Sequence, residues 1–341
     1  MSEVKSVRER ISPATRVKNF LIENALVFVI FIMVVYTGFK ADQFISLRNL
    51  KSILANVSVR FVIAIGVSGC LIIRGTDLSA GRIVGITAVL TGIMLQRSDA
   101  PGVLYPALAG KPILMALVCA MTLGLVFGII NALIIAYLHV PPFIGTLGMQ
   151  IAVYGLNMLL SKNSPIGSLN PAFTTFGAKG LTMGSLTIPW VFFVAFFVGV
   201  IFHILYKKTT YGKYMYAIGG NEEAAEVSGV NTTRQKFLIF SIAGVLYGLA
   251  GFLLAAKTGS AAVSAATGYE LEAIAAATIG GVSTAGGVGS VPGILIGVIV
   301  FELLKTCLQF LGITPEMTYV VQGIVIVAAV ALDIRKTMRK R

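Results

Sequence analysis

Residues that bind metals, form disulfides or perform catalysis are scarce in this chain. It has two histidines and three cysteines, and the cysteines lie far apart in apolar runs without any CxxC pair. The spacing indicates neither a disulfide nor a metal site. The Gly-Lys pairs at 110–111 and 212–213 lack the following Ser or Thr of a P-loop, so we expect no ATP hydrolysis by such a loop. We expect no catalytic residue, no metal ligand and no cofactor in this chain.

Apolar residues dominate the composition. Hydrophobic residues make up 56% of the 341 positions, and the mean hydropathy is +0.89, which excludes a disordered chain and an ordinary soluble domain. Since a helix needs about 20 residues to cross a bilayer, there is room for about nine or ten crossings and little mass for a soluble domain. The sequence predicts one all-α polytopic membrane domain, a transmembrane permease domain over residues 1–341.

Ten apolar segments are candidate membrane spans. No small-residue cleavage pattern follows the first segment, so we expect it to be retained. The eighth is short and rich in Ala and Gly, and a broken or re-entrant helix fits it equally well. The ten segments are residues 24–39, 53–73, 78–97, 112–138, 143–160, 186–206, 237–256, 270–281, 292–311 and 318–333.

The charges indicate how the chain crosses the membrane. Lys and Arg number 27 against 14 Asp and Glu, and basic residues gather in the N-terminal stretch 1–23, the loop 207–236 and the tail 334–341. Basic loops favour the cytoplasmic side, and an even number of spans places all three stretches there. We therefore expect both termini in the cytoplasm. No aromatic-rich or groove-reading module accompanies the charges, so nucleic-acid binding is not expected.

Two glycine-containing segments interrupt the apolar pattern and resemble each other. Ile73–Gly81 and Ile279–Gly287 share Ile and two Gly at equivalent positions, and we place both between the second and third spans of a five-span half. Two five-span halves insert in opposite orientations, which predicts an inverted five-plus-five repeat. The helix-break residues are Gly75, Thr76, Asp77, Ser79, Gly81, Gly281, Ser283 and Gly287.

The first break has a simple local explanation. Gly75 can end one helix by adopting a positive φ, and Asp77 can cap the next helix by accepting hydrogen bonds from its first amides. Contact of Asp77 with a permeant or coupling ion is the alternative.

Charged residues within the spans are few. Glu302 and Lys305 are three residues apart and can pair on one helix. Arg60 can snorkel to the surface, bond to another helix or serve the pathway. Glu270 and Glu272 are expected near the outer end of the eighth span, where water solvates them.

Several polar residues are candidates for lining a pathway. Hydrogen bonding between helices explains the amide side chains equally well. The candidates are Arg60, Asn131, Gln150, Asn157 and Gln322.

The loop after the sixth span contains a short helix signal. Asn221 is a good N-cap, Glu222 and Glu223 suit the positive end of a helix dipole, and Gly229 suits the C′ position. A helix of two turns is marginal alone, so we expect it to dock through Ala224, Ala225 and Val227. A surface helix packed on its own protein is the alternative.

Three stretches carry a family resemblance. Gly75–Gly81 (GTDLSAG), Tyr211–Val230 and Tyr269–Ser283 resemble the membrane subunits of bacterial ABC importers for monosaccharides, and the similarity covers nearly the whole chain. Within that family, Ser58–Arg60 and the run ending at Arg82 look most like the galactose and methyl-galactoside type.

The resemblance implies a type II-like ABC permease in the bacterial inner membrane. It implies a homodimer in lipid, a separate ATPase subunit that holds ATP and Mg, and a periplasmic sugar-binding protein. The loop helix then couples to the ATPase, through Asn221, Glu222, Glu223, Ala224, Ala225, Glu226 and Gly229.

Two other kinds of protein are alternatives to an ABC importer subunit. An ion-coupled secondary sugar carrier acting alone would use Asp77, Glu302 or Arg60 as its coupling site. An intramembrane enzyme would need paired catalytic groups in adjacent spans, and the sequence offers none.

Overall fold

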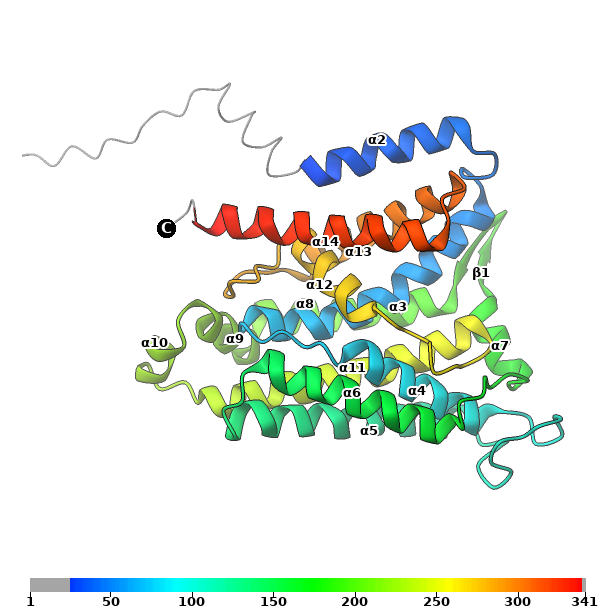
Figure 1. Cartoon of the computed structure of the whole chain (residues 1–341), viewed down its shortest axis with the longest axis horizontal. Coiled ribbons are helices and arrows are strands. Elements are labelled where there is room, and N and C mark those ends of the chain that lie inside the picture. The colour runs from blue at the N-terminus through cyan, green and yellow to red at the C-terminus, as the bar shows by residue number, and fades with distance from the viewer. Residues whose placement is uncertain (1–24, 339–341) are drawn as a thin grey trace, which may run out of the picture.

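The computed structural model describes residues 25–338, a bundle of helices whose long axes run roughly in one direction (Figure 1). The basic stretch predicted at 1–23 and the tail residues 339–341 lie outside the described residues. The helices are α2 (Ala25–Lys40), α3 (Leu47–Ile72), α4 (Ala80–Leu95), α5 (Ile113–Ala132), α6 (Pro142–Ser161), α7 (Pro171–Ala178), α8 (Trp190–Lys208), α9 (Thr210–Gly220), α10 (Glu222–Val227), α11 (Thr232–Thr258), α12 (Tyr269–Ile279), α13 (Val291–Phe310) and α14 (Pro315–Met338), and a π-helical turn, η1 (Leu133–Tyr137), extends α5.

The predicted spans and the helices agree in place but not always in length. Each of the ten predicted segments overlaps a helix, and seven of the described helices are long and apolar enough to cross a membrane. α2 and α4 have 16 residues each and α12 only 11. The eighth segment is therefore a partial helix, one of the two forms expected for it.

One region departs from the all-α prediction. Residues 186–189, expected to begin the sixth span, form the strand β2 (Leu186–Pro189), which pairs antiparallel with β1 (Gly180–Met183). The helix α8 begins only at Trp190, since the residues up to Pro189 are extended and paired in the hairpin. This hairpin and α7 lie at one end of the bundle, whereas α9, α10 and the C-terminal end of α14 lie at the other (Figure 1).

α11 is the central helix and packs against α3, α4 and α5. Glycines allow the close contact with α5: a Cβ at Gly124 would lie 2.2 Å from the carbonyl oxygen of Gly244, and one at Gly244 would lie 2.3 Å from that of Gly124. Small residues at such crossings are typical of membrane helices, which associate by packing.

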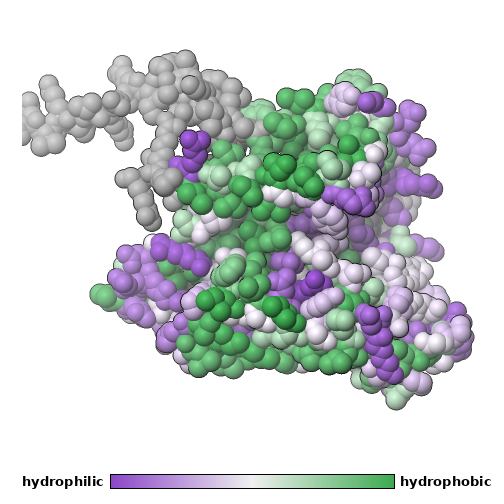
Figure 2. Space-filling model, in the orientation of Figure 1, coloured by the Kyte–Doolittle hydropathy of each residue, from purple (hydrophilic) through white to green (hydrophobic). Residues whose placement is uncertain are grey.

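The outer helices present apolar side chains outward. Large hydrophobic residues of α6, α8 and α14 are more than half exposed, among them Ile151, Phe197 and Ile324, and Figure 2 shows hydrophobic surface over much of the face that it draws. Such surfaces are expected against lipid or another membrane subunit.

α4 and α12 both begin inside the bundle after an irregular segment, 73–79 and 259–268 respectively (Figure 1). The sequence interpretation paired Ile73–Gly81 with Ile279–Gly287, and this placement is wrong. Residues 280–290 follow α12 and precede α13, between the eighth and ninth predicted segments, whereas the segment that precedes α12 is 259–268. The three shared residues are therefore no guide to equivalent positions.

Candidate functional site

The coupling segment, Asn221–Gly229, forms the short helix that the sequence predicts. Asn221 caps α10, because its Oδ1 accepts a hydrogen bond from the amide of Ala224 at 3.0 Å. Gly229 follows the helix with a φ of 86°, in the left-handed region that favours glycine.

The exposed face of α10 differs from the predicted docking surface. Ala225 is buried, with 5% of its surface exposed, whereas Val227 is 91% exposed and Glu223 and Ala224 are also exposed. Ala225 therefore packs on its own protein, and a partner can reach Glu223, Ala224 and Val227.

Two acidic residues hold α10 to the start of α11. Glu222 forms an ion pair with Lys236 at 2.5 Å, and Glu226 accepts a hydrogen bond from the hydroxyl of Thr232 at 2.7 Å. Since α10 is too short to be stable alone, these contacts and the burial of Ala225 fix its position.

Arg74 joins the first break to the end of α9, directly before the coupling segment. Its Nε donates to the carbonyl of Gly219 at 3.0 Å and its Nη2 to that of Gly220 at 2.7 Å, at the C-terminal end of α9. A cavity of about 220 Å³ lies beside these bonds, lined in part by Glu222 and Lys236.

The segment after α12 meets the same place. The amide of Gly287 donates to the carbonyl of Ile72 at 2.8 Å, and the hydroxyl of Tyr216, on α9, donates to the carbonyl of Gly289 at 2.9 Å. The end of α3, the end of α9 and residues 280–290 thus form one contact region, next to α10.

The first break ends α3 differently from the prediction. Arg74, with a φ of 62°, occupies the left-handed position, and Gly75 does not. The amide of Gly75 donates to the carbonyl of Cys70 at 2.8 Å, which is the bond between C″ and C3 of a Schellman motif. Space at Gly75 is tight instead, because a Cβ there would lie 3.0 Å from the ring of Phe240 and 3.3 Å from the carbonyl oxygen of Cys70.

Asp77 accepts hydrogen bonds at the start of α4, as predicted, but from Ser79, the residue just before the helix, and not from the first amides of the helix. Its Oδ1 accepts from the amide of Ser79 at 2.9 Å and from the Ser79 hydroxyl at 2.6 Å. Its Oδ2 accepts from the hydroxyl of Tyr247, on α11, at 3.1 Å. The carboxylate is 1% exposed and is engaged by the protein through both oxygens.

Neighbouring helices hold the rest of this break. Asn131, on α5, donates to the Ser79 hydroxyl at 2.8 Å. The hydroxyl of Thr146, on α6, donates to the carbonyl of Thr76 and accepts from the amide of Leu78, both at 3.1 Å. Thr146 of α6 therefore satisfies two backbone groups of the irregular segment, whereas α5 and α11 hold the side chains of Ser79 and Asp77.

The second glycine segment does contain left-handed residues. Gly281 and Gly287 have φ values of 87° and 75°. Thr284 donates to a carboxylate oxygen of Asp333, on α14, through both its amide and its hydroxyl at 2.9 Å, and the hydroxyl of Ser283 donates to that oxygen at 3.3 Å. These bonds fasten the segment to α14.

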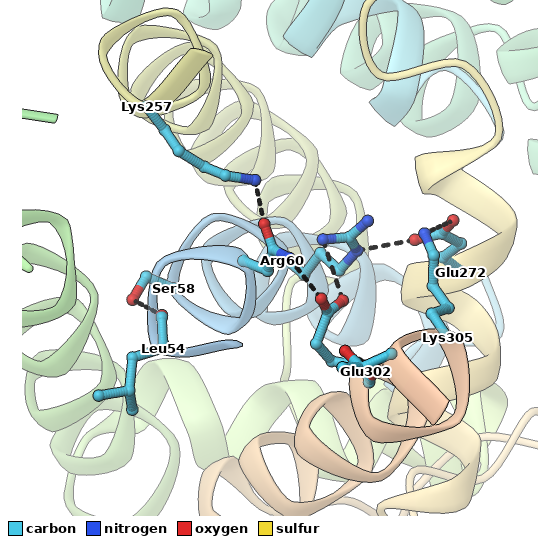
Figure 3. Close-up of polar contacts among 9 residues, drawn as sticks. Leu54, Ser58, Arg60, Lys257, Glu272, Glu302 and Lys305 are labelled. Carbon is cyan, nitrogen blue, oxygen red and sulfur yellow. Dashed lines mark hydrogen bonds and ion pairs between the residues drawn. The ribbon is translucent and has the colours of Figure 1, made fainter. Parts of the chain in front are cut away.

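A buried charge network lies between α3, α11, α12 and α13 (Figure 3). Arg60 pairs with Glu272 at 2.8 Å and with Glu302 at 3.1 Å, and Lys305 pairs with Glu272 at 2.6 Å. Asn56 donates to Glu302 at 2.5 Å and accepts from Lys257. We call these six residues the Arg60 network.

The Arg60 network corrects two predictions. Glu302 and Lys305 do not pair with each other, because each reaches a charge on another helix. Glu270 and Glu272 are not in water, since they are 5% and 6% exposed. Arg60 bonds to other helices, one of the three roles considered for it, and does not snorkel to the surface.

Of the other pathway candidates, Gln150 and Asn157 lie on one side of α6, whereas Asn131 lies on α5 and Gln322 on α14. Asn157 and Gln322 are buried at 1% and 5% exposure, and Asn131 belongs to the first break. Gln150 is half-buried on α6 and donates to Glu270 at 3.3 Å.

The sequence interpretation counted Arg74 and Arg82 among the cytoplasmic basic residues and named neither of them, nor Tyr154, as a site residue. The guanidinium carbon of Arg82 lies 4.4 Å from the centre of the Tyr154 ring. Both arginines flank a predicted helix break, and that position is the signal that could have singled them out.

Comparison with known proteins places this arrangement in a family. Residues 49–330 match the model for the permease component of branched-chain amino acid transport systems. The chain belongs to this permease family. This permease is 42% identical to the galactose/methyl galactoside import permease protein MglC of Escherichia coli K12, over 94% of its own length and 97% of the relative.

Other relatives agree. The MglC protein of Haemophilus influenzae is 40% identical over 95% of this permease and 97% of the relative, and the ribose import permease protein RbsC of Bacillus subtilis is 36% identical over 90% and 91%. No solved structure gives a significant match. The chain is thus a multi-pass membrane permease subunit of the ABC importer class, and the predicted family resemblance is confirmed.

Proposed function

We propose that this permease imports galactose or methyl galactosides as the membrane subunit of an ATP-driven, binding-protein-dependent importer. The observation that carries the proposal is the 40 to 42% identity, over almost the full length, to three galactose/methyl galactoside permeases. Two ribose permeases are less similar, at 32% and 36%. Specificity would then rest mostly in the sugar-binding protein.

ATP hydrolysis is assigned to a separate ATPase subunit, which holds ATP and Mg. The exposed face of α10 is its docking surface, in keeping with the helix signal in the sequence. A displacement of α10 moves the end of α9, and Arg74 transmits this displacement to the first break. The hydrogen bond between Gly287 and Ile72 transmits it further to residues 280–290. These bonds support a mechanism in which one displacement at the ATPase moves both segments.

The chain crosses the membrane ten times, with α4 and α12 as partial helices, and both termini are cytoplasmic. Placement of the basic loop 207–236 and of the end of α14 at one end of the bundle supports this orientation. Each half then contains a long helix, an irregular segment and a short helix in that order. In the first half these are α3, residues 73–79 and α4; in the second half they are α11, residues 259–268 and α12, and the inverted repeat relates the two sets.

Two copies form the pathway between them, in contact with lipid at their outer faces. The mostly exposed helices α6 and α14 support this arrangement, because each occupies the last position of its half and presents a large surface outward.

The test is reconstitution in liposomes. This permease, its ATPase and its sugar-binding protein together should accumulate labelled D-galactose only when ATP is supplied to the ATPase. The permease alone, under a proton or sodium gradient, should accumulate none. Uptake by the isolated permease under a gradient would instead establish the secondary carrier, for which the fully paired Asp77 and Arg60 give no support.

A further inference from the structure

The two partial helices meet at their N-terminal ends inside the bundle. A Cβ at Gly81, in the first turn of α4, would lie 2.7 Å from the carbonyl oxygen of Ala266, and one at Gly85 would lie 2.9 Å from that of Ala265. Both carbonyls belong to the irregular segment that leads into α12. In secondary transporters, the converging ends of interrupted helices hold the substrate contacts.

Polar side chains from three helices gather at this meeting point. Arg82, on α4, stacks on the ring of Tyr154 and donates to the hydroxyl of Thr267 at 3.1 Å. Gln150, on α6, donates to Glu270, on α12, at 3.3 Å. We call Arg82, Gln150, Tyr154, Thr267 and Glu270 the half-helix junction.

The junction can be reached from outside the chain. Tyr154 is 39% exposed and Thr267 is exposed, whereas Arg82 and Gln150 are half-buried behind them. On the face that Figure 2 draws, hydrophilic atoms lie between the hydrophobic surfaces above and below them. Gln150, Tyr154 and Asn157 follow the i, i+4, i+7 spacing, so one stripe of α6 faces the junction.

Unpaired polar atoms lie beneath the junction. Glu270 is 5% exposed, and its Oε2, which would be 2.0 Å from a Cβ at Gly81, has no hydrogen-bond partner among the described residues. Both side-chain amide atoms of Asn157 also lack a partner there. Buried polar groups without partners are costly, and within a membrane they mark functional positions.

We propose that the half-helix junction is where the transported sugar contacts the permease in mid-membrane, with Glu270, Gln150 and Arg82 hydrogen-bonding its hydroxyls and Tyr154 packing on its ring. This inference rests on the proposed function. One positive and one negative charge balance at the junction, which suits a neutral ligand. A monosaccharide presents hydroxyls around an apolar ring face, and the junction offers acceptors, donors and an aromatic ring together.

The test compares Glu270→Gln and Tyr154→Leu with a control on α8, Phe197→Leu, which lies outside the junction and is 62% exposed. Each is assembled with the ATPase and the sugar-binding protein in liposomes. The number of D-galactose molecules moved per ATP hydrolysed should fall about tenfold in both junction variants, equivalent to about 1.4 kcal/mol, and stay unchanged in the control. Unchanged ratios in the junction variants would overturn the inference.

A second measurement covers variants that fail to assemble. Tyr154→Cys, in a Cys119→Ala background, should react with a water-soluble thiol reagent, and D-galactose delivered by its binding protein should slow that reaction. Slowing by L-leucine instead, or no slowing, would contradict a sugar site. If the unmodified permease moves no galactose at all, the proposed function is wrong. If it moves galactose normally and the junction variants behave like it, only the proposal of a sugar contact at the junction is wrong.

Discussion

At the residue scale, the Arg60 network shows how a membrane interior can hold five charges. Three cations and two carboxylates lie together, and the amide of Asn56 bridges Lys257 and Glu302. Each carboxylate bonds to at least one group on another helix. Several close contacts therefore offset the free-energy cost of removing these charges from water. The network therefore acts as a fastening between α3, α11, α12 and α13.

Removing one carboxylate of the Arg60 network should lower the stability of the permease. Glu272→Gln leaves Arg60 and Lys305 without their shared partner, and a broken buried ion pair typically costs about 3–5 kcal/mol of unfolding free energy. Thermal unfolding of the purified permease in detergent measures the loss. The double variant Glu272→Gln, Lys305→Met should recover part of it, because one of the unpaired cations is gone. An unfolding midpoint unchanged in the single variant would contradict the fastening role.

Asp77 distinguishes a structural carboxylate from a coupling site. Asp77→Asn keeps an acceptor for Ser79, and we expect a loss of about 1 kcal/mol in stability with uptake retained. Asp77→Ala removes the acceptor of three donors, the Ser79 amide, the Ser79 hydroxyl and the Tyr247 hydroxyl, and should cost about 1–3 kcal/mol for each one left unpaired. Unfolding midpoints and ATP-driven galactose uptake measure both. Lost uptake in a fully stable Asp77→Asn variant would favour an ion site.

At the scale of elements, α10 is held by its buried side and offers its exposed side to a partner. Val227→Arg adds charge and bulk to the exposed side, so the permease should insert normally but lose most of its stimulation of the ATPase, about tenfold or more. ATP turnover of the assembled complex is the measurement. Leu108→Arg, in the loop between α4 and α5 at the other end of the bundle, is the control and should leave the stimulation intact.

The link between α9 and the first break can be tested separately from docking. Arg74→Lys keeps the charge but cannot donate to two carbonyls with a fixed fork. We expect ATP turnover to persist while galactose uptake falls about fivefold to tenfold, equivalent to about 1–1.4 kcal/mol of coupling. Arg97→Lys, at an exposed ion pair with Asp99, is the matched control. Equal losses of uptake and ATP turnover in Arg74→Lys would indicate a defect in docking instead.

At the scale of the whole molecule, the orientation decides which partner meets which end. Val227→Cys should react with a membrane-impermeant thiol reagent only in inside-out vesicles, and Leu108→Cys only in right-side-out vesicles, both in a Cys119→Ala background. The reason is that α10 and the α4–α5 loop lie at opposite ends of the bundle (Figure 1). Reaction of both variants from the same side would contradict the orientation.

Local features of the fold could be read from the sequence. Apolar segments of helix length located the long helices, because burial of backbone polar groups in a bilayer leaves few alternatives to a helix. The N-cap at Asn221 and the left-handed Gly229 were also predicted, since capping depends on residues within one turn. The positions of the ten segments follow from such short-range rules, although the hairpin at 180–189 does not.

Contacts between distant residues were decided only by the tertiary structure. Arg60 and Glu272 are 212 residues apart, and nothing within a turn of Glu302 indicates that it meets Arg60 rather than Lys305. The same holds for the inward face of Ala225 and for the meeting of α4 with α12. The sequence determined a multi-span helical membrane protein through hydropathy and capping, which act over a few residues. The packing of whole helices decided the partners of its charges and the place where its two partial helices converge.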